Sequence, residues 1–262
     1  MDTSHQKIII MKTIFHRNEV VESTNQWAMS HINEVLNNEL HIFSAAFQSA
    51  GRGQGDHTWE SESGENILMS LLMKNPPVKV ADQFSLSQVI AVAAHNYVSA
   101  ELPGQEISIK WPNDIMVDSR KIAGILIENS LKGNDILATV IGIGVNVNQI
   151  HFSGDLQAAV SLEMIDGKKR DIETEINKLT GAFLTSYENF LALGAEKTYW
   201  SYDGRLFGIG TEQNFKLGND ILKCTILGSE HNGQMRLKMP DGNEKKFYHH
   251  EIAMCYREDL LI

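Results

Sequence analysis

Apolar residues recur along this chain with two different periods, which predicts a sheet and helices packed against each other. Residues 66–73 (NILMSLLM) are almost continuously apolar, a pattern typical of a strand covered on both faces. Over 82–100, by contrast, Leu86, Val89, Ile90 and Ala93 follow the spacing of a helix. The same reasoning predicts strands over 12–22, 42–47, 66–73 and 136–147, and helices over 26–36, 82–100 and 171–193.

The pattern changes at about Leu206, where short alternating segments replace the long ones. Residues 221–227, 234–239 and 245–250 are separated by Asn-Gly and Pro-Asp-Gly turns. Short strands joined by tight turns predict a small antiparallel barrel. We therefore expect two domains, 1–205 and 206–262, the larger of mixed α+β class.

The stretch 110–128, KWPNDIMVDSRKIAGILIE, places charged residues between apolar strands. Trp111-Pro112-Asn113-Asp114 should interrupt strand pairing, because proline has no N–H to donate. A lysine inside a strand must be paired or must face an anion, and a mid-strand glycine such as Gly124 often marks the approach of a ligand. A surface ribbon with solvated lysines is the alternative. The expected elements are one strand over 106–110 that resumes at 115–117, a turn at 118–120, and a return strand over 121–128.

A second polar segment, Gln48–Trp59, contains three glycines, Arg52 and an aromatic ring. Glycines let a loop turn its backbone N–H groups toward an anion. Arg52 adds a planar cation suited to carboxylate or phosphate. Such a loop alone is a weak signal, because a flexible linker has the same composition.

A third signal lies at the end of the strand predicted over 136–147, where small and amide side chains alternate with aliphatic ones. Period two places Gly142, Gly144, Asn146 and Asn148 on one face of the strand. A face of glycine and amide is poor core material. It predicts a floor on which a flat ligand can lie, with amides to bind its polar edges.

Composition and charge argue against several classes of protein. The net charge of −10 argues against a nucleic-acid platform. No apolar run approaches the roughly 18 residues of a membrane span, and the N-terminal apolar run is too short for a secretory signal. The two cysteines, Cys224 and Cys255, have no spacing typical of a disulfide framework or a zinc site. We expect a cytoplasmic protein.

Taken in order, these motifs resemble the catalytic domain of biotin–protein ligases. The resemblance covers about residues 15–150, and five motifs in one order are specific where any one would not be. It implies a mixed sheet with flanking helices, similar to class II aminoacyl-tRNA synthetases, and an SH3-like barrel. The motifs stand here as Ser23-Thr24-Asn25, Gly51-Arg52-Gly53 with Trp59, Ser61 with Gly64 and Asn66, Lys110–Asp114 with Lys121 and Gly124, and Gly142 with Asn146.

Two departures from the family pattern stand out. Many members carry further arginines in the glycine loop, where this chain has Gln54 and His57, with Asp56 where glycine is common. Binding of the phosphate should then depend more on Arg52 and Lys121. Some members also have an N-terminal DNA-binding domain, which we do not expect here, because the chain is acidic and its first motif already begins at Ser23.

The resemblance implies two half-reactions, with ATP, Mg²⁺ and biotin as reactants or cofactors. Biotin is activated as biotinyl-5′-AMP and then transferred to a lysine of a biotin carboxyl carrier protein domain of a biotin-dependent carboxylase. The resemblance implies neither DNA nor membrane as a partner and leaves a homodimer open.

The resemblance also assigns roles to individual residues, with Lys121 and Arg52 as the catalytic cations. No residue is assigned to a metal, since Asp114 is as well explained by an ion pair with Lys110. Biotin is expected at Ser23, Thr24, Asn25, Gln48, Gly51, Arg52, Lys121, Gly124 and Gly142, and ATP or the adenylate at Gln54, His57, Trp59, Lys110, Asn113, Asp114 and Asn146.

Two other functions compete with this interpretation. A lipoate–protein ligase shares the chemistry, but it should show an Arg-Arg and Gly-Gly-Gly loop and lack the Trp-Pro-Asn-Asp turn. A non-catalytic sensor of biotin or nucleotide would not require Lys121 and Arg52 to converge on a phosphate.

Overall fold

The computed structural model describes residues 11–55, 57–152 and 159–255 of the 262-residue chain. Its larger part is built on a seven-stranded sheet in the order β1-β2-β3-β7-β6-β5-β4. β1 and β2 run parallel and all other neighbours antiparallel, so the predicted mixed sheet is confirmed. The strands are β1 (Lys12–Val21), β2 (Glu39–Gln48), β3 (Asn66–Lys74), β4 (Ile107–Lys110), β5 (Asp114–Val117), β6 (Arg120–Lys132) and β7 (Asp135–Asn146).

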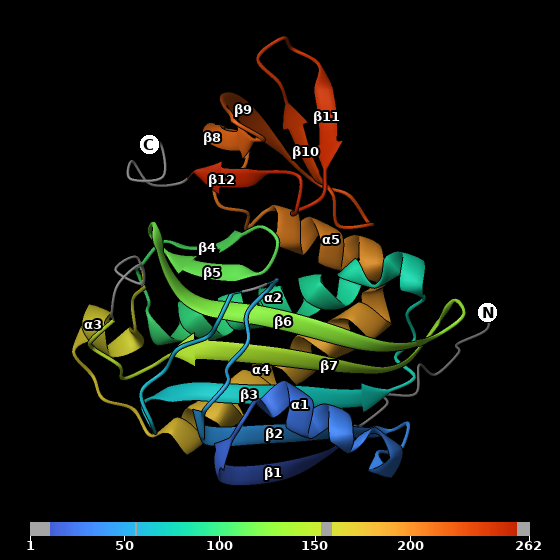
Figure 1. Ribbon diagram of the computed structural model, residues 1–262, viewed down its shortest axis with the longest axis vertical. Helices are drawn as coiled ribbons and strands as arrows, with labels where there is room; N and C mark the ends of the chain where they lie inside the picture. The colour runs from blue at the N-terminus through green and yellow to red at the C-terminus, as the bar shows by residue number, and fades with distance from the viewer. Residues whose placement is uncertain (1–10, 56, 153–158, 256–262) are drawn as a thin grey trace, which may run out of the picture.

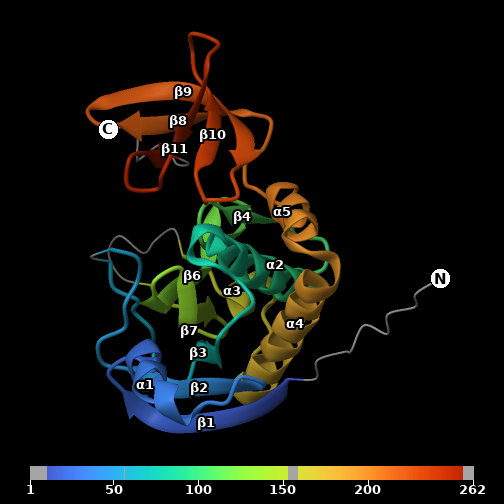
Figure 2. The ribbon, with the colours of Figure 1, turned by 90° about the vertical axis from the view of Figure 1, so that its right-hand side faces the viewer.

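Helices cover the two faces of this sheet unequally. Figure 2 shows α2 and α4 together on one side of the sheet and α1 on the other. The face that carries α1 is otherwise left to loops, and this is where a ligand can enter. The helices are α1 (Thr24–Ser30), α2 (Phe84–Glu101), α3 (Leu162–Asp166), α4 (Ile172–Leu193) and α5 (Ala195–Asp203), with short 3-10 turns η1 (Ile32–Glu34) and η2 (Val80–Asp82).

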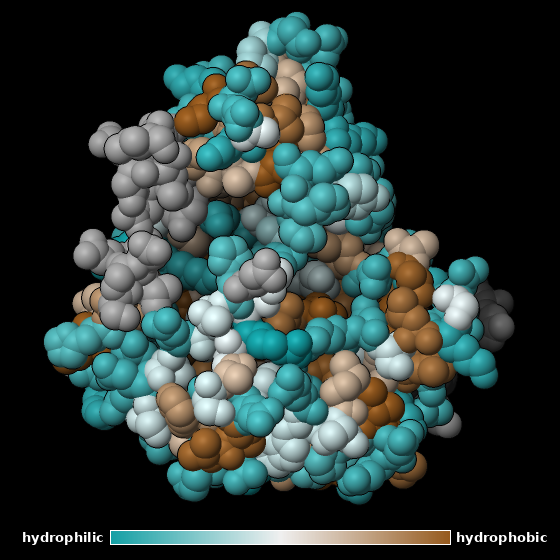
Figure 3. Space-filling model, viewed as in Figure 1, coloured by the Kyte–Doolittle hydropathy of each residue, from teal (hydrophilic) through white to brown (hydrophobic). Residues whose placement is uncertain are grey.

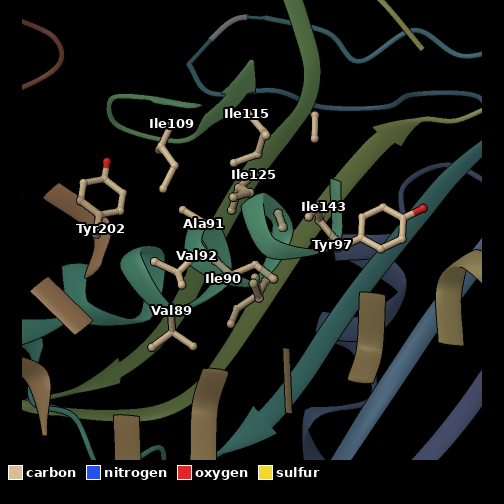
Figure 4. Close-up of a cluster of buried hydrophobic side chains, with 14 of the residues drawn as sticks. Val89, Ile90, Ala91, Val92, Tyr97, Ile109, Ile115, Ile125, Ile143 and Tyr202 are labelled. Atoms are coloured by element: carbon tan, nitrogen blue, oxygen red, sulfur yellow. The ribbon is translucent and has the colours of Figure 1, made fainter. Parts of the chain in front are cut away.

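The core lies between the sheet and α2. In β3 every residue from Asn66 to Met73 is buried, because β2 and β7 flank the strand and helices cover it. α2 is buried on most of its circumference rather than on one stripe. Figure 4 shows the residues gathered there: Val89, Ile90, Ala91, Val92 and Tyr97 of α2 beside Ile109, Ile115, Ile125 and Ile143 of the sheet, with Tyr202.

Two local predictions were wrong. The helix predicted over 26–36 ends at Ser30 and continues only as a 3-10 turn, because Val35 turns to an extended conformation and packs beside Phe43. The segment 111–113 does not interrupt one strand. It is the reverse turn between β4 and β5, which pair antiparallel with Lys110 opposite Asp114.

The C-terminal part is a five-stranded antiparallel sheet in the order β11-β10-β9-β8-β12, above the large sheet in Figure 1. The three predicted strands are confirmed as β9, β10 and β11, whereas β8, β12 and the preceding α5 were not predicted. Its strands are β8 (Glu212–Leu217), β9 (Asp220–Ser229), β10 (Met235–Lys238), β11 (Glu244–Phe247) and β12 (Ala253–Cys255).

Residues 205–207 connect the two parts along the edge of the large sheet. Ile109 of β4 donates its N–H to the Arg205 carbonyl and accepts from the Phe207 N–H, so the connecting chain forms a bridge at the edge of the large sheet. One apolar cluster continues from the large sheet through Leu206 to Phe215 and Ile226. The division 1–205 and 206–262 stays a prediction. No helix among the described residues has the length and apolarity needed to cross a membrane.

Asp203, the last residue of α5, connects this helix to β9 of the C-terminal sheet. Its carboxylate accepts hydrogen bonds from the Ser229 N–H (3.0 Å) and the Ser229 Oγ (2.6 Å). Gly228 lies next to it with φ +130°, and a side chain there would collide with the carboxylate. Burial raises the pKa of Asp203 above its ordinary value. The hydrogen bonds from Ser229 are therefore needed to hold a carboxylate there.

We predict that Asp203→Ala lowers the free energy of unfolding by about 1–3 kcal/mol, because it leaves the buried Ser229 donors without an acceptor. Urea denaturation followed by circular dichroism measures this change. Asp220→Ala, in an exposed position at the start of β9, is the control and should leave the midpoint unchanged. Equal midpoints for the two variants would show that Asp203 does not fasten the sheet.

Candidate active site

A cavity of about 930 Å³ opens on the face of the large sheet that carries α1. In Figure 3 the surface is hollowed between the large-sheet part and the C-terminal part, with hydrophilic residues around much of the hollow. Residues from both parts line it. Of the residues predicted for the site, the cavity is lined by Ser23, Thr24, Asn25, Gln48, Arg52, Gln54, His57, Trp59, Lys110, Asn113, Asp114, Lys121, Gly124 and Gly142.

Asp114 lies between two lysines at one end of the cavity. Its Oδ1 is 2.7 Å from Lys121 Nζ, and its Oδ2 is 3.3 Å from Lys110 Nζ. Strand pairing explains this geometry: Lys110 faces Asp114 across β4 and β5, and an irregularity after Ile115 brings Lys121 of β6 into reach. Burial alone would raise the pKa of Asp114, but the two ammonium groups lower it below the ordinary value of 3.8. Asp114 is thus an ionised carboxylate that holds two cations.

The turn at 111–113 is pinned on several sides. Asn113 donates its side-chain amide to the Ile125 carbonyl (2.6 Å) and accepts the Ile125 N–H at its own carbonyl. Trp111 Nε1 donates to the Gly233 carbonyl in the turn between β9 and β10, and Tyr202 Oη donates to the Pro112 carbonyl. Asn113 lines the cavity, but its amide nitrogen is already bonded to the Ile125 carbonyl and stabilises the turn. The pinned turn fixes Asp114, the next residue.

The glycine loop is folded back on itself as a small hairpin. Trp59 N–H donates to the Gly51 carbonyl, and Gly53 N–H donates to the His57 carbonyl. A side chain at Gly51 would collide with the Trp59 carbonyl, which explains a glycine there. Gly51 itself does not line the cavity, whereas Gln54 and His57 do. Asp56, noted as a departure from the family pattern, lies outside the described residues.

Arg52 reaches from this loop to β6. Its Nη2 lies 2.9 and 2.8 Å from the two oxygens of Glu128. Glu128 also accepts a hydrogen bond of 2.7 Å from the Asn25 amide. Sequence reasoning missed Glu128, because one glutamate at the end of an apolar strand carries no motif of its own.

Trp59 lies flat on the sheet where two glycines face each other. Gly124 of β6 pairs with Gly144 of β7, and a side chain at either would collide with the indole. Lys121 Nζ is 5.6 Å from the centre of this ring. The indole Nε1 is buried without a hydrogen-bond partner among the described residues, so it is a donor that a ligand could use. The alternation of β7 had placed Gly144 on the floor, but it was not assigned to the site.

The polar floor next to the tryptophan is a connected set of side chains. Gln48 Oε1 accepts from the Thr24 N–H (2.7 Å) and lies 3.0 Å from Thr24 Oγ1. Ser70 Oγ lies 2.8 Å from Thr24 Oγ1 and donates to Asn25 Oδ1 (2.6 Å). Gly142 leaves room for the Asn25 side chain. Ser23 occupies the N-cap position of α1 without a capping bond from its side chain.

Asn146, like Gly51, is a predicted ligand contact that does not line the cavity. It is buried outside the cavity lining, and its amide donates to the Val160 carbonyl (3.1 Å). Val160 N–H in turn donates to the Lys121 carbonyl (2.9 Å). Asn146 therefore stabilises the backbone of Lys121 indirectly, through Val160.

The C-terminal part contributes a wall that sequence reasoning missed. His249, His250, Ile252, Ala253 and Met254 line the cavity. Burial and the neighbouring His250 lower the pKa of His249, whose ring meets Trp111 edge-on at 6.5 Å between centres. No sequence motif marks these residues, because they reach the site only through the docking of the C-terminal sheet.

Comparisons with known proteins agree on one family. The biotin/lipoate A/B protein ligase family matches residues 18–146. The bifunctional ligase/repressor BirA of Bacillus spizizenii is 30% identical over 243 residues, covering 90% of this chain and 72% of that protein. The biotin--[acetyl-CoA-carboxylase] ligase of Paracoccus denitrificans is 32% identical over 141 residues, covering 52% and 58%.

A solved structure supports the fold. The biotin protein ligase of Aquifex aeolicus, in complex with biotin and ATP, superposes with a TM-score of 0.74 at 22% identity, covering 92% of this chain and 98% of that one. The resemblance inferred from the motifs is therefore confirmed. This chain belongs to the biotin/lipoate A/B protein ligase family, and it is a ligase.

Proposed function

We propose that this chain activates biotin with ATP as biotinyl-5′-AMP and transfers the biotinyl group to a lysine of a biotin carboxyl carrier protein domain. One observation carries the proposal. Among the described residues that line the cavity, Arg52, Lys110 and Lys121 are cationic and Asp114 is the one carboxylate, in a chain whose net charge is −10. A local excess of cations suits the meeting of two anions, a carboxylate and a polyphosphate.

Lys121 is the residue best placed to stabilise the first step. The biotin carboxylate attacks the α-phosphorus of ATP, a P–O bond forms, and the bond to pyrophosphate breaks. Negative charge gathers on the α-phosphate oxygens in the transition state. Asp114 and the pinned turn hold the Lys121 ammonium in place beforehand, so little reorganisation is needed when this charge develops.

The polar floor fits the ring end of biotin. Thr24, Asn25 and Gln48 present hydroxyl and amide groups that can pair with a ureido ring. Gly124, Gly142 and Gly144 keep the sheet flat there, and Trp59 supplies an aromatic surface for the bicycle or the adenine. Gln54, His57, Lys110 and Asn113 line the remaining part, which we assign to the nucleotide.

In the second step the amine nitrogen of the carrier lysine attacks the carbonyl carbon of the mixed anhydride. The carbon–oxygen bond to the phosphate breaks, AMP leaves with that oxygen, and the amine loses a proton. The cavity opens between the two sheets, so a lysine side chain can reach it from solvent. The carboxylase named for the Paracoccus denitrificans relative supports a carboxylase carrier domain as the acceptor.

The described residues provide no protein cage for Mg²⁺. They contain no group of three or more His, Cys, Asp or Glu residues placed to hold a metal ion. Asp114, the carboxylate of the cavity, is already neutralised by two lysines. We therefore assign no step to a protein-bound metal, and we expect any Mg²⁺ to arrive on the phosphates of ATP. Because the reaction consumes ATP, we keep the cytoplasm as its expected compartment.

The proposal is tested by pyrophosphate release from ATP. Biotin should stimulate pyrophosphate release and lipoate should not. A biotin carboxyl carrier protein domain added to the reaction should then become biotinylated. Stimulation by lipoate alone would favour the lipoate–protein ligase. Tight biotin binding without pyrophosphate release would favour a sensor.

We predict that Lys121→Ala slows pyrophosphate release by about 10²–10³-fold, some 2.7–4 kcal/mol, while biotin binding stays measurable. The reason is that the lost charge contact is strongest in the transition state. Single-turnover release measures the first quantity and calorimetry the second. Lys121→Arg should not restore the rate, because a planar fork does not replace a compact ammonium at this site. A rate equal to that of the original protein would remove Lys121 from the mechanism.

We predict that Asp114→Asn destabilises the protein by about 1.5–3 kcal/mol at neutral pH, because Lys110 and Lys121 lose a charged acceptor. The folded-state pKa of Asp114 lies below 3.8, so this contribution is present above that pH and is lost as the pH falls through the folded-state pKa. Urea denaturation at several pH values measures the window. Asp118→Asn, on the exposed turn of the same hairpin, is the control. A stability gap that does not narrow in acid would contradict the ionised state of Asp114.

A further inference from the structure

Glu128 stands behind the cavity, where the glycine loop meets the polar floor. On β6 it follows Gly124 and Leu126 at steps of two, so its side chain projects from the cavity face of the sheet. It does not line the cavity itself, but its two partners Arg52 and Asn25 do. Glu128 therefore touches both the loop and the floor without occupying the space for a ligand.

The contact with Arg52 uses one corner of the guanidinium. Both described bonds, 2.9 and 2.8 Å, come from Nη2 and end on the two carboxylate oxygens. A guanidinium carries five N–H donors in one plane, so Nε and Nη1 keep an edge with which to bind a second anion. Glu128 can thus orient Arg52 and leave it able to donate to a ligand.

The contact with Asn25 fixes the amide orientation. Asn25 Nδ2 donates to Glu128 (2.7 Å) and more weakly to the Leu126 carbonyl (3.3 Å), while its Oδ1 accepts from Ser70 (2.6 Å). An acceptor on one side and a donor on the other define which end of the amide is nitrogen. The orientation of this floor residue depends on the carboxylate of Glu128.

A carboxylate serves both partners without placing a donor opposite either of them. Arg52 and Asn25 both present N–H donors, and an ionised carboxylate is an acceptor at each oxygen. A glutamine would offer one acceptor oxygen and would turn an NH₂ group toward one of these donors. The pair Arg52–Glu128 is also partly exposed, with 42% and 31% of the side chains accessible, so its role in stability is small compared with its role in orientation.

We propose that Glu128 is a positioning residue of the ligation site, which aligns the loop cation Arg52 and the floor amide Asn25 toward the same bound biotin. The inference rests on the proposed function and deepens it: the carboxylate of Glu128 orients Arg52 toward the acid group of the ligand and, by a second contact, orients Asn25 toward its ring. Lys121 performs the chemistry next to this aligned pair.

The test compares Glu128→Ala and Glu128→Gln with the original protein. Glu128→Ala should raise the Kd for biotin by about ten-fold or more, the size expected for loss of a charge-assisted hydrogen bond, and change kcat for pyrophosphate release much less. Glu128→Gln keeps the side-chain volume and one acceptor oxygen, so its Kd for biotin should lie between those of the original protein and Glu128→Ala. In an Arg52→Ala background the effect of Glu128→Ala should shrink, because the two residues act together.

Asp135→Ala is the matched control. Asp135 is the first residue of the neighbouring strand β7 and lies outside the cavity. The substitution breaks its exposed ion pair of 2.6 Å with Lys79 and should leave biotin affinity unchanged. Unchanged affinity in both Glu128 variants would overturn the proposal. Tighter binding by Glu128→Ala would also overturn it, since Glu128 would then compete with the ligand for Arg52.

Calorimetry with biotin separates this proposal from the proposed function. If the original protein binds biotin but releases no pyrophosphate, the ligase function fails and the affinity series still decides the role of Glu128. If release is normal and only the Glu128 series is flat, the positioning role alone fails. If biotin does not bind at all, both are wrong.

Discussion

The carboxylate of Asp114, shared between Lys110 and Lys121, is the contact on which the site depends. Two ammonium groups this close would repel each other, and in a half-buried position neither could be fully hydrated. Asp114 makes their proximity stable and still leaves the group of three with a net positive charge. Keeping these three charges together in the folded state costs little free energy, and the group still attracts a polyanion. Its position is set by strand register and by the turn at 111–113, so the electrostatics of the site are a product of the sheet.

The two faces of the large sheet have divided tasks. α2 and α4 bury one face in a continuous apolar core, and this frees the other face to carry glycines, amides and charges. The polar face is kept rigid by cross-links between elements that are distant in the chain, such as Gln48 to Thr24, Ser70 to Asn25 and Asn146 to Val160. Rigid polar groups bind a ligand with less loss of entropy than mobile ones.

Much of this arrangement could be predicted from the sequence, because the signals were local. Alternation and helical spacing located β3, β7, α2 and α4, and the lysine hairpin and glycine loop contain most of the residues that line the cavity. What the sequence did not predict depends on tertiary contacts. Glu128 acquires its role only when Arg52 arrives from a loop 76 residues away, and His249 only when the C-terminal sheet docks. The turn at Pro112 was misjudged because a break in one strand and a reversal between two have the same local sequence features.

The wall formed by residues 249–254 has a consequence for how the protein is made. The lining of the cavity begins at Ser23 and ends at Met254, so its residues are made at widely separated times during synthesis. A growing chain that has reached the end of the large sheet already contains the lysine hairpin, but it lacks one side of the ligand site until residues 249–254 have emerged. Completion of the site is thereby tied to the synthesis of residues 249–254, and the large sheet alone does not enclose the full cavity in which a reactive adenylate would be shielded.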